Sequence, residues 1–130
     1  RLSLMGGLEI YSEIIALLGT LPQMDRARTL RLAEAAAQRG AEAKLDLLFT
    51  LLEIALARLA RTGATGQPPA IEAAPHEAAI LSKLASTPHQ GRAWADISHS
   101  ALARARHGRA VNLDPAALVL DTMFKIRDTA

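Results

Sequence analysis

The sequence predicts an all-α fold, a compact bundle of five to six helices around one central apolar helix. Half of the 130 residues are hydrophobic but only 3% are aromatic, so the core must consist mainly of Leu, Ile and Ala. Ala and Leu have the highest helix propensities. β-Branched residues nowhere form the alternating run that is typical of a strand. The length suits one domain with a single core.

The first helix is expected over residues 8–18, because its apolar residues recur at helical spacing. These residues are Leu8, Tyr11, Ile14, Ile15 and Leu18. The Gly6–Gly7 pair before them predicts a flexible joint. We therefore interpret residues 1–6 as the remnant of a preceding domain or linker in a longer protein, and residues 7–130 as the helical domain.

A second helix is expected from residue 22 or 25 to Arg39. Asp25 is a suitable N-cap, because its carboxylate can accept from an amide of the first turn. Gly40 stands where a C′ glycine belongs. The predicted apolar stripe of this helix is thin and consists of Met24, Ala27, Leu30, Ala33 and Ala37.

The third helix, expected over residues 41–61, is predicted to be the central element, with Leu52 in its core. One apolar stripe consists of Leu45, Leu48, Leu52, Ala55, Leu56 and Leu59, and it is widened by Leu47, Phe49, Leu51 and Ile54. A narrow polar line remains, formed by Asp46, Thr50, Glu53 and Ala57. A helix that is apolar nearly all round packs on several sides. The Gly- and Pro-rich stretch 63–75 that follows predicts a mobile loop.

A short fourth helix is expected over residues 76–85, and a fifth over residues 91–107. The fourth presents Ala79, Ile80, Leu81 and Leu84, and the fifth presents Trp94, Ile97, Ala101, Leu102 and Ala105. Because the helical neighbours of Trp94 are apolar, we interpret this tryptophan as a core anchor rather than a ligand platform.

The last helix, expected over residues 114–127, has a sharply specified start. Asp114 is a good N-cap, and Pro115 occupies the first helical position, where its missing N–H costs nothing. Leu113 and Leu118 have the spacing of a hydrophobic staple, which fixes the angle at which the chain enters the helix.

No motif predicts a catalytic, cofactor or metal site. The chain has no cysteine, which excludes disulfides and thiolate ligands and fits a reducing cytoplasm. Asp96, His99 and His107 are too few on one helix face for a metal site. Ser98 and Ser100 flank His99 but point in other directions, and no phosphate-binding loop occurs. The longest apolar run is too short to span a membrane, so we expect a cytoplasmic protein without membrane contact.

Four arginines, Arg26, Arg28, Arg104 and Arg106, are the candidate interface residues. Most of the 15 basic residues are arginine, whose planar group suits protein interfaces. A net charge of only +2 and the lack of interleaved aromatic residues speak against strong nucleic-acid binding. Contact with DNA phosphates and a plain solvated surface remain the alternatives.

Four motifs in order resemble the C-terminal region of the delta-prime subunits of bacterial DNA polymerase III, alphaproteobacterial ones above all. They are Gly6–Tyr11, Asp25–Arg28, Gly40–Ala43 and Asn112–Pro115. The likeness covers nearly the whole chain. It implies a helical collar domain, which assembles clamp-loader subunits into a pentameric ring that loads the sliding clamp onto DNA during replication.

The resemblance implies no catalytic residue here, because the ATPase-like and zinc modules belong to other parts of such subunits. The implied partners are the other clamp-loader subunits, while DNA and the sliding clamp are reached only through the full complex. A helical ligand- or partner-binding domain of a transcriptional regulator is the alternative. It would require an apolar cavity among the helices.

Overall fold

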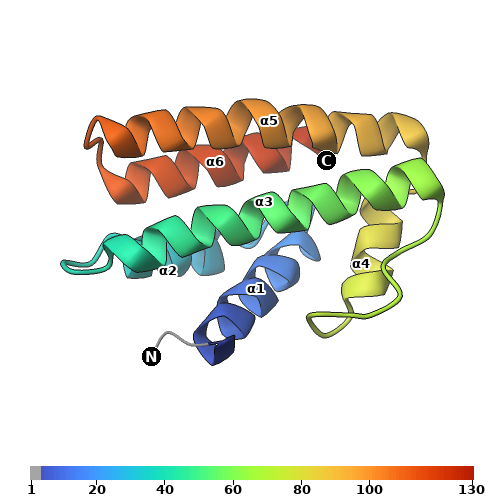
Figure 1. Ribbon diagram of the computed structural model, residues 1–130, viewed down its shortest axis with the longest axis horizontal. Helices are drawn as coiled ribbons and strands as arrows, with labels where there is room; N and C mark the ends of the chain where they lie inside the picture. Colours follow the sequence, from blue (N-terminus) through green and yellow to red (C-terminus); the bar gives the residue numbers. More distant parts are fainter. Residues whose placement is uncertain (1–3) are drawn as a thin grey trace.

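The computed structural model describes residues 4–130 and contains six α-helices (Figure 1). They are α1 (Leu4–Leu18), α2 (Arg26–Ala36), α3 (Glu42–Thr65), α4 (Glu77–Leu84), α5 (Pro88–Ala110) and α6 (Pro115–Thr129). No strand occurs in this described part of the chain. The predicted all-α fold and the number of helices are therefore confirmed.

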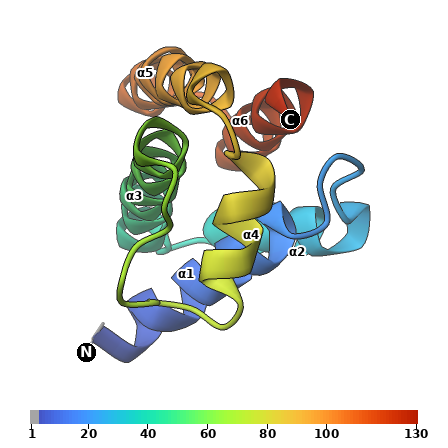
Figure 2. The ribbon, with the colours of Figure 1, turned by 90° about the vertical axis from the view of Figure 1, so that its right-hand side faces the viewer.

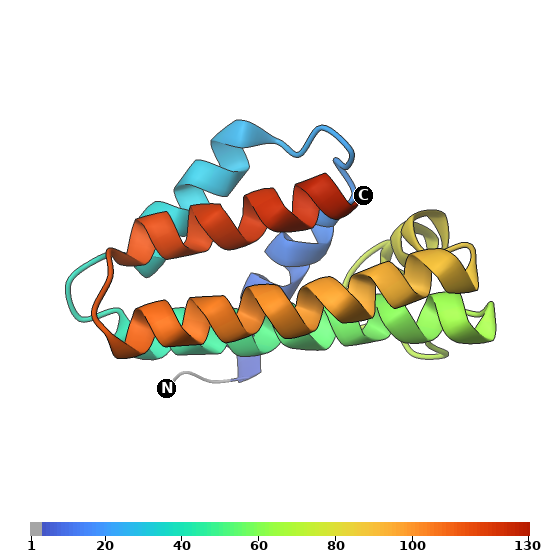
Figure 3. The same ribbon diagram turned by 90° about the horizontal axis from the view of Figure 1, so that it is seen from above.

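The long helices α3 and α5 form an antiparallel pair that sets the long axis of the molecule, and α6 turns back along α5 (Figure 3). α2 packs against α6, and α1 crosses beneath α3. The short α4 lies at the end of the bundle where α3 ends and α5 begins (Figure 1). An end-on view shows α5 and α6 on one side of the core, with α1 and α4 on the other (Figure 2).

α3 is the central helix, as predicted, because it packs against α1, α2, α4 and α5. Its predicted stripe is buried throughout, and Leu52 is only 1% exposed. The widening residues behave differently: Phe49 is buried, but Ile54 is 44% exposed. The outer side of α3 thus faces solvent, since no helix covers it.

The predicted N-caps of α2 and α6 are confirmed. The Asp25 carboxylate accepts from the Arg28 amide at 3.1 Å. The Asp114 carboxylate accepts from the Ala117 amide at 3.0 Å, with Pro115 at the first helical position. α5 begins earlier than predicted, at Pro88, because Thr87 caps it in a reciprocal capping box with Gln90.

The predicted joint at Gly6–Gly7 is wrong. α1 begins at Leu4 and runs through both glycines. Glycine in a helix interior costs only about 1 kcal/mol, which tertiary packing can override. Residues 1–3 of the expected preceding segment lie outside the described part. Leu8, predicted to be apolar core, is 48% exposed, whereas the rest of its stripe is buried.

The predicted apolar face of α2 is only partly correct: Met24 and Ala33 are buried, but Ala27 and Leu30 are exposed. The buried residues are Thr29, Leu32, Ala33 and Ala36, while Leu30 is 42% exposed. Thr29 can be buried because its hydroxyl donates to the Asp25 carbonyl at 2.8 Å. The helix stops at Ala36, so Gly40, with φ of 81°, serves the turn into α3 rather than the helix end.

The loop after α3 is shorter than predicted, because the helix continues through Gly63 to Thr65. Gly63 packs directly on Gly91 of α5: a Cβ added at Gly63 would lie 2.5 Å from the Gly91 Cα. The helix ends at Gly66, whose φ of 78° is left-handed. Close helix–helix contact thus keeps a glycine helical where the sequence predicted a loop.

Candidate interaction surfaces

Two of the four candidate arginines join helices within the bundle. Arg104 of α5 forms an ion pair with Asp121 of α6 at 3.3 Å. Arg106 of α5 donates to Glu53 of α3 at 2.8 Å. This hydrogen bond lowers the pKa of Glu53 below its usual range and raises the pKa of Arg106. The side chain of Arg104 is 66% exposed and that of Arg106 is 48% exposed, so both stay candidate interface residues.

The two candidate arginines on α2 lie apart from that pair. The Arg28 Nε lies 3.8 Å from an oxygen of the Asp25 carboxylate, and Asp25 is the N-cap of α2. Arg26 is exposed and has no ion pair among residues 4–130. The four candidate arginines are therefore divided between two helices, two on α2 and two on α5.

The predicted polar line of α3 is the edge that faces α5. Besides Glu53, Asp46 of this line pairs with Arg109 of α5 at 3.2 Å. Both pairs connect α3 to the C-terminal half of α5. The polar line is thus a seam between two helices rather than a simple solvated face.

A buried carboxylate that the sequence did not indicate joins α1, α3 and α4. Glu77, at the start of α4, has no exposed surface. Its side chain accepts from the Tyr11 hydroxyl and from the Ala73 amide, the latter at 2.7 Å. The Arg58 Nε lies 2.9 Å from Glu77 Oε2, an ion pair without the angle of a hydrogen bond.

The same network holds the loop between α3 and α4. Arg58 donates through Nη2 to the Ile71 carbonyl at 2.8 Å, and Glu72 accepts from the Ala78 amide at 2.8 Å. Burial and the hydrogen bond to Glu77 raise the pKa of Tyr11. Tyr11, Arg58 and Glu77 thus contact one another and the loop within the fold. They come from three distant parts of the chain, so sequence spacing carried no signal for them.

An exposed apolar surface lies at the turn between α5 and α6. Val111 is 52% exposed and Leu113 is 55% exposed, while Asn112 has a left-handed φ of 61°. Leu113 and Leu118 both reach Gly108, where an added Cβ would lie 3.3 and 2.4 Å from their methyl groups. The two side chains of the predicted staple, Leu113 and Leu118, thus lie over Gly108. More than half of the Leu113 surface remains exposed to solvent.

This turn shares a groove of about 230 Å³ with the turn between α2 and α3. The groove is lined by Ala36, Ala37, Gln38, Arg39, Glu42, Leu45, Arg109, Asn112, Leu113 and Pro115. We call this groove with Val111 the turn surface. It combines exposed apolar side chains with arginines.

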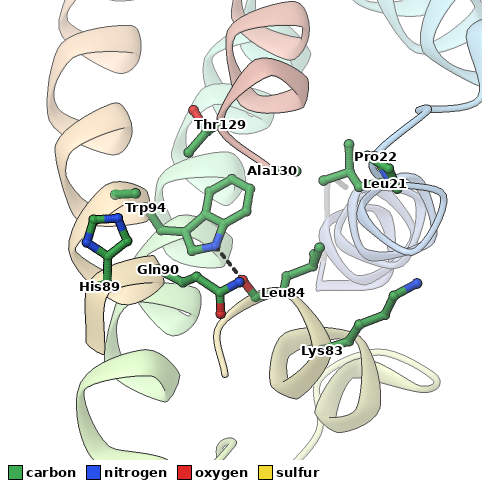
Figure 4. Close-up of a pocket in the computed structure, with 10 residues that line it drawn as sticks. Leu21, Pro22, Lys83, Leu84, His89, Gln90, Trp94, Thr129 and Ala130 are labelled. Atoms are coloured by element: carbon green, nitrogen blue, oxygen red, sulfur yellow. Dashed lines mark hydrogen bonds between the residues drawn. The ribbon is translucent and has the colours of Figure 1, made fainter. Parts of the chain in front are cut away.

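A second groove, of about 310 Å³, lies at the other end of the bundle (Figure 4). It is lined by Leu21, Pro22, Lys83, Leu84, His89, Gln90, Ala93, Trp94, Thr129 and Ala130. Trp94 is 1% exposed and donates from its indole nitrogen to the Leu84 carbonyl at 2.9 Å. The prediction that Trp94 anchors the core is confirmed, and its ring also borders this groove.

The histidines and serines considered as chemical groups lie apart from one another. His99 and Ser100 are exposed on α5, and the Ser100 hydroxyl donates to the Asp96 carbonyl at 3.2 Å. Over residues 4–130, no three His, Cys, Asp or Glu side chains come close enough to hold a metal ion. None of the helices in that range has both the length and the apolar character needed to cross a membrane.

Comparison of the chain with protein-family models, with curated proteins and with solved structures finds no match.

Proposed function

We propose that this domain is a non-enzymatic oligomerisation module, the helical collar of a clamp-loader subunit similar to delta-prime. It binds the collars of other clamp-loader subunits and helps to assemble the ring that loads the sliding clamp onto DNA. It needs no cofactor, and it reaches the clamp and DNA only through the full complex. The observation that carries the proposal is the exposed apolar turn surface beside arginines.

The turn surface has the composition of a protein interface. Such interfaces place apolar side chains at the centre and polar groups, arginine prominent among them, at the rim. Val111 and Leu113 supply the apolar part, and Arg39 and Arg109 stand beside Leu113 in the groove. Both apolar side chains are more than half exposed in this structure.

The turn is also held in one conformation before a partner arrives. The cap by Asp114, the fixed φ of Pro115 and the contacts of Leu118 over Gly108 restrict its backbone. A preorganised surface loses less conformational entropy on binding, which favours affinity. These residues overlap the motif Asn112–Pro115, on which the resemblance to delta-prime partly rests.

The packing gives less support to a ligand-binding domain of a transcriptional regulator. Such a domain needs an apolar cavity among its helices. The grooves described here open to the surface, and α3 fills the centre of the bundle with fully buried side chains, Leu52, Leu56 and Leu59 among them. Direct DNA binding is also less favoured. Several arginines, Arg104, Arg106 and Arg109 among them, are paired to acidic side chains.

The proposal is tested by mixing the 130-residue chain with purified collar domains of the other clamp-loader subunits and measuring molecular mass. We expect a complex that Leu113→Asp weakens, because a buried carboxylate without a partner is costly. Ile71→Asp is the matched control: this residue is 80% exposed, in the loop at the opposite end of the bundle.

A parallel titration with duplex DNA at physiological salt separates the alternatives. Tight, steeply salt-dependent DNA binding without a collar complex would overturn the proposal, and contact with DNA phosphates would then be the favoured function. If Leu113→Asp and Ile71→Asp weakened the collar complex equally, the turn surface would not be part of the interface.

A further inference from the structure

Two charged side chains of the turn surface, Arg39 and Glu42, have opposite signs and no partner. Both are exposed, and neither forms an ion pair within the part of the chain that the structure describes. The third charged side chain of the groove, Arg109, already pairs with Asp46 at 3.2 Å. The charges therefore balance, because Asp46 offsets Arg109 and Glu42 offsets Arg39.

This balance argues against an occupant of a single charge. An acidic segment would face Glu42, and a basic segment would face Arg39. A surface that carries one free group of each sign beside exposed apolar side chains can satisfy both. A second copy of this chain presents a surface of that kind.

The apolar side chains stand next to these two charges. The turn between α2 and α3 and the turn between α5 and α6 lie together at one end of the bundle (Figure 3). Leu113 lines the same groove as Arg39 and Glu42 and is more than half exposed, as is Val111 two residues earlier. Contact between two copies at this end would remove these leucine and valine side chains from water.

We propose that two copies of this chain form a symmetric dimer through their turn surfaces. Arg39 of each copy pairs with Glu42 of the other, and the two Leu113 side chains are buried between them. A two-fold interface uses the same patch on both subunits, so the contact between residues 39 and 42 occurs twice and the assembly closes at two copies. The inference goes beyond the proposed function, because the dimer needs no other subunit.

The turn that carries the two charges is fixed by its own backbone. Gly40 has a left-handed φ of 81°, and the Ala41 amide donates to the Gln38 carbonyl at 3.0 Å. Glu42 is the first residue of α3, so its backbone is held by the helix. Little backbone entropy is therefore lost when a second copy binds.

Sedimentation equilibrium of the 130-residue chain alone, from micromolar to millimolar concentration, tests the dimer. We expect the mass to rise from one chain to two and no further. Leu113→Asp is expected to keep the chain monomeric, because it would bury two carboxylates without partners.

Two charge reversals test the pairing of the subunits. Arg39→Glu and Glu42→Arg each place like charges at both contacts, and each is expected to weaken the dimer by roughly tenfold or more. In an equimolar mixture of the two variants, opposite charges face each other again at both contacts. The mixture is therefore expected to dimerise about as tightly as the wild type.

Arg31→Glu and Glu34→Arg are the matched controls. They make the same changes of charge on exposed residues of α2 that do not line the groove. We expect both controls to dimerise like the wild type, and circular dichroism shows that each variant is folded.

The outcomes separate this inference from the proposed function. A chain that stays monomeric over the whole range, or a mass that rises beyond two chains, would overturn the inference. It would also be wrong if the groove variants and the controls had equal effects, or if the mixture of reversed variants failed to recover the dimer. None of these results affects the proposed function, which depends on complexes with other collars, and a failure of those complexes would leave the dimer standing.

Discussion

Replacing Gly63 with alanine tests how closely α3 and α5 approach each other. A Cβ at this position would lie 2.5 Å from the Gly91 Cα, 2.7 Å from the Gly91 nitrogen and 2.8 Å from the Thr87 carbonyl oxygen. All three atoms belong to the backbone, so no side chain can rotate away. Ordinary contact begins near 3.4 Å, and the two helices must therefore separate by about 1 Å.

The expected cost follows from two opposing effects. Overpacking a well-packed interior costs about 1–3 kcal/mol, and a clash with three backbone atoms belongs at the upper end. Alanine gains about 1 kcal/mol over glycine in a helix interior. The net loss in the free energy of unfolding is therefore roughly 2 kcal/mol, which lowers the melting temperature by roughly 6–10 °C for a domain of this size.

Thermal and urea unfolding followed by circular dichroism measure this effect, and Gly7→Ala is the matched control. Gly7 lies in α1, and a Cβ added there would meet nothing within 4 Å. The control is therefore expected to be as stable as the wild type or up to about 1 kcal/mol more stable. If Gly63→Ala behaves like Gly7→Ala, the helices do not touch at this point and the reasoning is refuted.

Three further predictions concern the core, a cap and the buried network. Leu52→Ala is expected to lower the free energy of unfolding by about 2–5 kcal/mol, and an unchanged thermal melt would show that α3 is not central. Asp114→Ala is expected to cost about 0.5–2 kcal/mol in urea unfolding, and a cost below that range would contradict its role as a cap. Burial raises the pKa of Tyr11 in the folded state above the ordinary tyrosine value of about 10. The protonated Tyr11 hydroxyl therefore contributes its full stabilisation below about pH 10, and this stabilisation is lost as the pH rises toward the folded-state pKa. Tyr11→Phe is expected to remove that alkaline loss, and urea titrations at about pH 8 and pH 11 would disprove the argument if both proteins lost the same stability.

Local rules predicted the parts of the fold that depend on neighbours in sequence. The caps at Asp25 and Asp114 use amides three residues away, and the stripe around Leu52 repeats along one helix. Such features need no knowledge of the rest of the chain.

The failures lie where contacts between distant segments decide. Gly63 is helical because Gly91 packs against it. Thr29 is buried because its hydroxyl donates a hydrogen bond to the Asp25 carbonyl. Glu77 is buried because Tyr11 and Arg58 supply its partners from two other helices. The ion pairs of the candidate interface residues Arg104 and Arg106 likewise depend on acidic side chains of adjacent helices, so sequence spacing did not predict them.

The contact between Gly63 and Gly91 also determines which residues of α3 can stand opposite which residues of α5. A slide of one heptad would bring Ser98 to the place of Gly91, and a side chain would then occupy the space that the two backbones share. The same slide would separate Asp46 from Arg109 and Glu53 from Arg106. These exposed ion pairs add little to stability. Together with the glycines they exclude the shifted alignments that a Leu- and Ala-rich helix pair could otherwise adopt, so that one sequence folds to one structure.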